Sequence, residues 1–301
     1  MTIGRREAAR LLLAGAFAGL SAPRALARCE GIAPGQKPQN TFPQDVGQTL
    51  DDIVARGFIE IAVYEDYRPY SWEDGGKPMG IDVEIGRIIA ESLGVEARFR
   101  FVEAGENLDA DLLNYIWKGA TVGGHVSNLM MRVPYNSDYT CRVEQVVFTG
   151  QYASETIAIA YRLADYPEGG PKPAYFRYDT VAVENDSISD FYLTSLVGPA
   201  KDNIHRYGST AEAMEALAAG EVMAAMGPLA VLEAGLTPDL AVHRPPLPNF
   251  SLGTWTVGIA LHMSHRDLGY AADDAISAAL GDGRIPAIYA ALGLGYIAPE
   301  R

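Results

Sequence analysis

Hydrophobic and polar residues follow a regular pattern from about residue 50 onward. Residues 59–63 alternate between the two kinds, as a strand with one buried face does. Residues 81–93 then place four isoleucines and Leu93 on one helical face, and residues 95–102 alternate again. This order predicts a strand–helix–strand unit whose two strands run parallel.

A second unit of the same kind follows a segment rich in proline and glycine at residues 166–173. It comprises a strand at 180–183, helices at 186–196 and 210–219, and a continuously apolar strand at 222–226. The chain then gives a strand at 254–261 and helices at 268–280 and 285–292. Strands that alternate with helices predict an α/β fold.

The first 49 residues precede the predicted α/β fold. Arg5, Arg6 and Arg10 precede an apolar run at 11–20 and a small-x-small site at 25–27, which is typical of an export signal over residues 1–27. The paired arginines resemble a twin-arginine signal, and Sec export is the alternative. Residues 28–49 are expected to form an extended leader, and the mature protein is expected to be periplasmic.

The charge balance narrows the choice of partners. The chain has 24 basic and 38 acidic residues, and removing the first 27 leaves 20 and 37, a net charge of −17. A protein with this net charge is a poor binding partner for nucleic acid and anionic lipid. The acidic surface keeps the protein soluble, or it favours docking onto a basic protein.

The sequence offers little for catalysis. It contains no Gly-x-Ser-x-Gly elbow and no phosphate-binding glycine loop, so we expect a protein that is not an enzyme and has no cofactor or metal. Cys29 and Cys141 are the two cysteines. In an oxidising compartment they allow one disulfide, and two separate thiols are the alternative.

Six segments in the same order resemble the type II periplasmic solute-binding proteins, in particular the polar-amino-acid branch, family 3. These are residues 50–57, 61–70, 79–84, 148–152, 211–225 and 280–283. The resemblance implies a two-lobed fold, with lobe 1 at 50–153 and 253–301 and lobe 2 at 154–252. Hinge crossovers would lie near 154–161 and 247–256, with ligand in the cleft between the lobes.

The resemblance also implies candidate ligand-binding residues in lobe 1. Arg142 stands where family members bind a carboxylate, with Ser137 and Tyr139 where they have a Ser/Thr pair. A surface arginine paired with a carboxylate is the alternative for Arg142. Tyr70 and Trp72 stand where aromatic side chains line the cleft, and core packing is the alternative for both.

In lobe 2 the chain departs from the family pattern. Asp186 and Ser187 stand at the helix start where an anion usually docks, and a helix cap is the alternative role. Pro228 occupies the position of the ammonium-binding aspartate. In lobe 1 residues 123–139 also depart from the pattern, because Ser127 and Asn128 replace the usual acidic residue and residues 133–135 interrupt it. These departures resemble the solute-binding-like accessory proteins of PQQ-dependent methanol and other alcohol dehydrogenases.

Three functions therefore stay open at the level of sequence. The first is a periplasmic solute receptor that closes around a small molecule and serves an ABC transporter permease. The second is an accessory or maturation protein that binds a periplasmic quinoprotein dehydrogenase. The third is a dehydratase-like enzyme, in which Asp82 or Glu84 would abstract a proton.

Overall fold

The structure, a computed structural model, describes residues 49–121 and 124–301. The described strands are β1 (Phe58–Tyr64), β2 (Trp72–Asp74), β3 (Lys77–Met79), β4 (Glu96–Val102), β5 (Leu129–Tyr135), β6 (Val146–Arg162), β7 (Val181–Glu184), β8 (Ile204–Tyr207), β9 (Ala224–Pro228), β10 (Leu240–His243) and β11 (Thr254–His262). The α-helices are α1 (Leu50–Arg56), α2 (Ile81–Ser92), α3 (Leu108–Leu112), α4 (Ser137–Arg142), α5 (Ile188–Val197), α6 (Thr210–Ala219), α7 (Leu229–Ala234), α8 (Arg266–Gly281) and α9 (Arg284–Ala291). A π-helical turn, Leu113–Trp117, and 3-10 turns at Pro173–Arg177 and Gly198–Asn203 complete the described helical elements.

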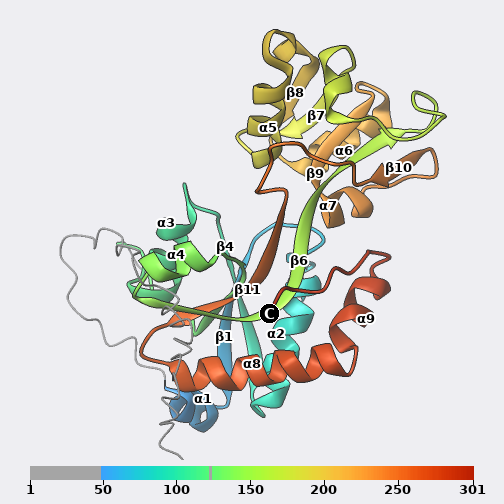
Figure 1. The fold of residues 1–301 in the computed structure, drawn as a ribbon. Coiled ribbons are helices and arrows are strands. Elements are labelled where there is room, and N and C mark those ends of the chain that lie inside the picture. The colour runs from blue at the N-terminus through green and yellow to red at the C-terminus, as the bar shows by residue number, and fades with distance from the viewer. Residues whose placement is uncertain (1–48, 122–123) are drawn as a thin grey trace, which may run out of the picture.

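One long strand runs through both lobes. Residues 146–156 of β6 pair with β11, and residues 157–162 pair with β9 and β10. Figure 1 shows β6 and the segment that leads into β11 bridging two separate groups of helices and strands. These two connections are the hinge crossovers of a two-lobed α/β fold.

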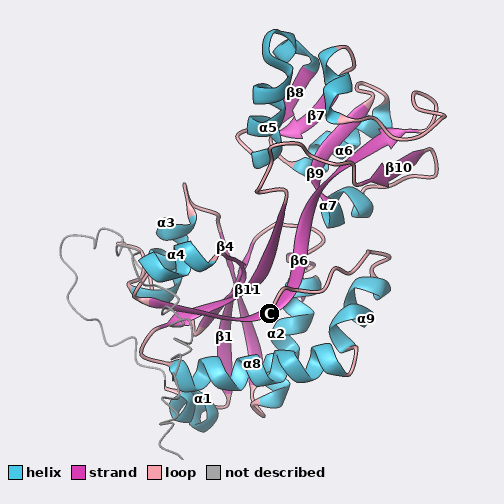
Figure 2. Cartoon of the chain, in the orientation of Figure 1, coloured by secondary structure: helices cyan, strands magenta, loops and turns pink. Residues whose placement is uncertain are grey.

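Lobe 1 contains the larger hydrophobic core. Its strands follow the order β4-β1-β5-β11-β6, with β1 parallel to β4 as the sequence predicts. Helices α2 and α8 pack against the sheet, and α9 packs against these two helices (Figure 2). The core between them contains Ile61, Ile85, Ile89 and Ile276, all fully buried.

Lobe 2 is a smaller sheet of β6, β9, β7 and β8, with β10 on the other side of β6. Its two apolar cores lie on the two faces of this sheet, because Val181 and Val183 belong to one and Ala182 to the other. The short strands are therefore apolar at successive positions.

Local sequence signals explain several element ends. In α1 the side chain of Thr49 accepts from the backbone N–H of Asp52, and the Asp52 side chain bonds back, which forms a capping box. Helix α6 spans the ten residues that the sequence predicts, and Gly220 ends it in the left-handed conformation. Strand β9 begins two residues later than predicted, at Ala224, because residues 221–223 belong to the turn after α6.

The predicted signal peptide, the leader up to residue 48 and Cys29 lie outside the described residues. The pairing of Cys29 with Cys141 therefore stays a prediction, as do the signal and the lobe boundaries. No helix among residues 49–121 and 124–301 combines the length and hydropathy needed to cross a bilayer.

Candidate ligand site between the two lobes

A cavity of about 690 Å³ lies where the lobes meet the hinge. Lobe 1 contributes side chains from the ends of β1 and β5 and from α3, and the hinge contributes residues of β6 and β11. Lobe 2 contributes Ile188, at the start of α5, and the segment before β11 adds Ser251 and Leu252. A cavity of this size accommodates a small metabolite.

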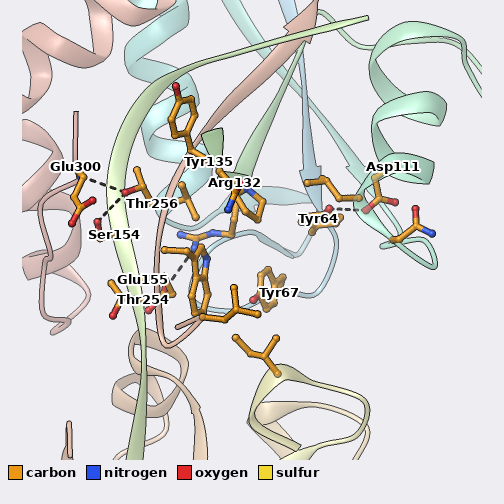
Figure 3. Close-up of a pocket in the computed structure, with 18 of the residues that line it drawn as sticks. Tyr64, Tyr67, Asp111, Arg132, Tyr135, Ser154, Glu155, Thr254, Thr256 and Glu300 are labelled. Atoms are coloured by element: carbon orange, nitrogen blue, oxygen red, sulfur yellow. Dashed lines mark hydrogen bonds and ion pairs between the residues drawn. The ribbon is translucent and has the colours of Figure 1, made fainter. Parts of the chain in front are cut away.

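The floor of the cavity contains a buried charge cluster. Arg132 lines the cavity and is 7% exposed, and its Nε donates to Asp82 Oδ2 at 2.8 Å. Its Nη1 lies 3.6 Å from Oε2 of Glu155, a second cavity-lining residue that is 5% exposed. Figure 3 shows Arg132 in the middle of the site, joined to Glu155. One guanidinium therefore faces two carboxyl groups.

Tyrosines hold the carboxyl groups of this cluster in place. Tyr152 donates its hydroxyl to Asp82 Oδ1 at 2.8 Å, and Tyr70 donates to Glu155 Oε2. The guanidinium also lies over the Tyr70 ring, with Cζ 3.2 Å from the ring centroid. The Nη2 atom of Arg132 is buried and has no hydrogen-bond partner among the described residues.

A bulge in β5 directs Arg132 into this cluster. The pairing of β11 with β5 jumps from Gly258 and Val133 to Ala260 and Met130, so β5 has one residue more than its partner here. Arg132 lies inside the bulge and has a φ of 58°, a left-handed value that side chains other than glycine rarely adopt. The bulge therefore interrupts the usual alternation of the strand.

Burial disfavours charge on both acids of the cluster. Desolvation raises the pKa of Asp82 and the pKa of Glu155 above their ordinary values, although the Arg132 guanidinium opposes each shift. Because a single guanidinium balances only one carboxylate, the ionised cluster has a net charge of −1.

The far wall of the cavity is acidic and aromatic. Asp111 is buried, and it accepts from the Tyr64 hydroxyl at 2.7 Å and from the backbone N–H of Gly105 at 2.7 Å. Tyr64, Tyr67, Tyr135 and Trp255 are half-buried cavity-lining residues. Figure 3 shows the Tyr64–Asp111 pair on the opposite side of Arg132 from Ser154, Thr256 and Glu300.

The aromatic residues singled out from the sequence do not line this cavity. Tyr70 is fully buried beneath Arg132, and Trp72 is buried at a separate groove beside α2 and α9. Their neighbours Tyr64 and Tyr67 line the cavity instead. The cavity-lining rings therefore lie in the same segment, residues 61–70, but at other positions than Tyr70.

The polar residues proposed from the sequence lie on α4 and in the turn before α5. Arg142 is exposed at the end of α4, 5.7 Å from the Tyr139 ring, and Tyr139 donates to Asp109. Ser137 is the first residue of α4.

Ser187 is the N-cap of α5, accepting from the backbone N–H of Asp190, while Asp186 has a φ of 57° and accepts from Asn185. None of Tyr139, Arg142, Asp186 and Ser187 is among the cavity-lining residues, so their part in binding stays a prediction.

Sequence reasoning missed Arg132, Glu155 and Asp111. Each is a single charged residue in or beside an apolar run, and the partner of Arg132 is 50 positions away along the chain. The sequence did contain one signal for this cluster, the charge of Arg132 within the apolar residues 129–133. An arginine in a buried strand requires a counter-ion.

Comparison with known proteins identifies the fold. No family model matches the chain, and no curated protein matches it in sequence. An ancestral cationic amino-acid solute-binding protein is similar in structure, with a TM-score of 0.67 and 19% identity over 81% of this chain and 98% of that chain.

Two natural proteins give a similar result. An amino-acid ABC transporter substrate-binding protein from Streptococcus pneumoniae, bound to L-arginine, has a TM-score of 0.59 and 18% identity over 83% of this chain and 100% of that chain. A solute receptor for L-cysteine of Neisseria gonorrhoeae has a TM-score of 0.57 and 20% identity over 81% and 93% of the two chains. The chain thus has the two-lobed fold of periplasmic solute-binding proteins.

Proposed function

We propose that the protein is a periplasmic solute receptor that binds a small molecule in the interlobe cavity and closes around it. The observation that carries the proposal is the position of the cavity. The cavity lies at the crossover strands β6 and β11. Its lining residues come from lobe 1, from these two strands and, through Ile188, from lobe 2. A ligand there contacts both lobes and so stabilises the closed arrangement by its differential affinity.

The structural neighbours support the same function. Their descriptions name solute receptors and ABC transporter substrate-binding proteins. A closed, ligand-bound receptor presents a different surface from an open one. A transporter permease is the partner that would recognise the closed form. Export to the periplasm, through the signal at residues 1–27, belongs to the same proposal.

A thermal-shift screen of the mature protein tests the proposal. The screen covers amino acids, amines, organic acids and sugars, because any ligand that binds only the folded state raises the melting temperature. Trp255→Ala removes a cavity wall and Trp72→Ala removes a tryptophan at the separate groove, so the two are matched. We expect a stabilising solute whose effect is lost in Trp255→Ala and kept in Trp72→Ala.

The same screen decides between this proposal and the other two functions. A flat screen, together with capture of a periplasmic quinoprotein dehydrogenase, would favour the accessory role. Turnover of a solute would favour a dehydratase, although both Asp82 oxygens are engaged and Glu84 pairs with Arg87 beside the separate groove. One of the structural neighbours is described as a precursor of cyclohexadienyl dehydratase.

A further inference from the structure

The charges around the cavity are unbalanced. Among its described lining residues, Arg132 has the one basic side chain, whereas Asp111, Glu155 and Glu300 are acidic. Arg132 is also shared with Asp82, which lies directly behind it. The cavity and the buried cluster beneath it therefore contain four carboxyl groups and a single guanidinium.

The geometry points to an organic cation without a carboxylate, an amine or a quaternary ammonium ion, as the ligand of this cavity. The inference rests on the proposed solute-binding function and names the class of solute. Its positive group would supply the second counter-charge that the cluster of Asp82, Glu155 and Arg132 lacks.

Arg132 is poorly placed to bind the carboxylate of an amino acid. Its Nε is bonded to Asp82, its Nη1 faces Glu155, and its Nη2 is buried. A ligand carboxylate would be the third negative group around one buried guanidinium. Arg142, at the position where the family's carboxylate-binding arginine is expected, is exposed outside the cavity lining.

The aromatic walls suit the same ligand class. Tyr64, Tyr67, Tyr135 and Trp255 expose part of their rings to the cavity. The faces of such rings attract ammonium and guanidinium groups, and cages of them with acidic residues recognise quaternary ammonium ions. Asp111, beside Tyr64, adds a buried carboxylate at the opposite end of the cavity from Glu155.

Binding of a cation would also be linked to pH through Glu155. Glu155 is surrounded by titratable and charged groups from the loop after β1 and from α2, β5, β6 and α9. These groups are Tyr67, Tyr70, Asp82, Arg132, Tyr152 and Tyr289. Arg132 is the single cation among these groups. A bound ammonium therefore favours the ionised form of Glu155, and protonation of Glu155 opposes binding.

Isothermal titration calorimetry with matched probes tests the inference. Agmatine differs from arginine by one carboxylate, and choline differs from glycine betaine by the carboxylate that replaces its hydroxymethyl group. We expect agmatine or choline to bind more tightly than its partner by at least about tenfold, which is ~1.4 kcal/mol. Affinity should fall as the pH is lowered, because burial raises the pKa of Glu155 and the carboxylate becomes protonated at a higher pH than an ordinary glutamate.

Two variants separate binding from folding. Glu155→Gln keeps a hydrogen-bond acceptor for Tyr70 but removes the charge. It should therefore lower the affinity for the favoured probe by about tenfold and make that affinity less dependent on pH. Glu91→Gln removes an exposed carboxylate at the separate groove and should bind as the wild type does.

Tighter binding of arginine and glycine betaine would overturn the inference and leave the receptor function intact. Failure of all four probes would overturn it as well, and the wider solute screen would then decide the receptor function independently.

Discussion

Arg132 Nε lies 2.8 Å from Asp82 Oδ2, and this ion pair joins β5 to α2 in the interior of lobe 1. Glu155 approaches the same guanidinium from the hinge strand β6. The pair therefore connects the lobe 1 core to the strand that continues into lobe 2. With Glu155, this cluster has one carboxyl group more than the guanidinium balances, so we expect the connection to respond to protonation.

Loss of the guanidinium should destabilise the protein strongly. Arg132→Met leaves Asp82 and Glu155 buried without a counter-ion, which we expect to lower the free energy of unfolding by about 3–5 kcal/mol. Arg142→Met changes an exposed arginine and should stay within about 0.5 kcal/mol of the wild type. Urea denaturation followed by circular dichroism measures both, and equal stabilities of the two variants would contradict the role of the cluster.

Removing the excess charge should have the opposite effect. Burial raises the pKa of Glu155, so between its unfolded and folded pKa the folded chain binds more protons, and stability falls as the pH rises through this window. Glu155→Gln should abolish that loss, so the variant should be at least as stable as the wild type at neutral pH and its advantage should grow as the pH rises through this window. Melting temperatures across a pH series test this, and a variant less stable than the wild type at pH 7 would refute it.

The turn into α2 should not tolerate a side chain at Gly80. This residue has a φ of 121°, and a Cβ there would lie 2.2 Å from the Tyr70 carbonyl oxygen. Gly80→Ala should cost roughly 1–3 kcal/mol, since backbone strain and overpacking combine. Gly281→Ala, at the open end of α8, is the matched control and should be neutral or gain up to about 1 kcal/mol from helix propensity. Comparable melting temperatures for the two variants would contradict the steric account.

The two cysteines should form one disulfide in the exported protein. Cys141 is buried on α4, and Cys29 is the other cysteine of the chain. Peptide mapping of the mature protein without reductant should recover a linked pair of cysteine peptides. Recovery of two alkylated thiols would show that the bond is absent.

Much of the fold could be predicted from hydrophobic periodicity. The pattern gives β1, α2, β4 and α6 nearly to the residue, because each has one buried face and clear end signals such as Gly94 and Gly220. It fails at β5, where Arg132 and Pro134 interrupt the apolar run. A bulge that buries an arginine has no periodic signature.

The candidate site could be predicted only in part. The resemblance predicts aromatic ligand contacts at and after residues 61–70, but which rings face the cavity depends on how the chain turns between β1 and β2. Tyr70 lies beneath Arg132, while Tyr67 reaches the cavity. The charge cluster depends on contacts between residues far apart in the sequence, such as Asp82 with Arg132 and with Tyr152, which a single sequence does not reveal.

Closure around a solute is the central claim, and small-angle X-ray scattering tests it most directly. The mature protein should be measured alone and with a saturating concentration of the solute that stabilises it most in the thermal screen. We expect the radius of gyration to decrease when the solute is added, because the lobes rotate about β6 and β11. A solute that raises the melting temperature but leaves the radius of gyration unchanged would contradict closure of the cleft.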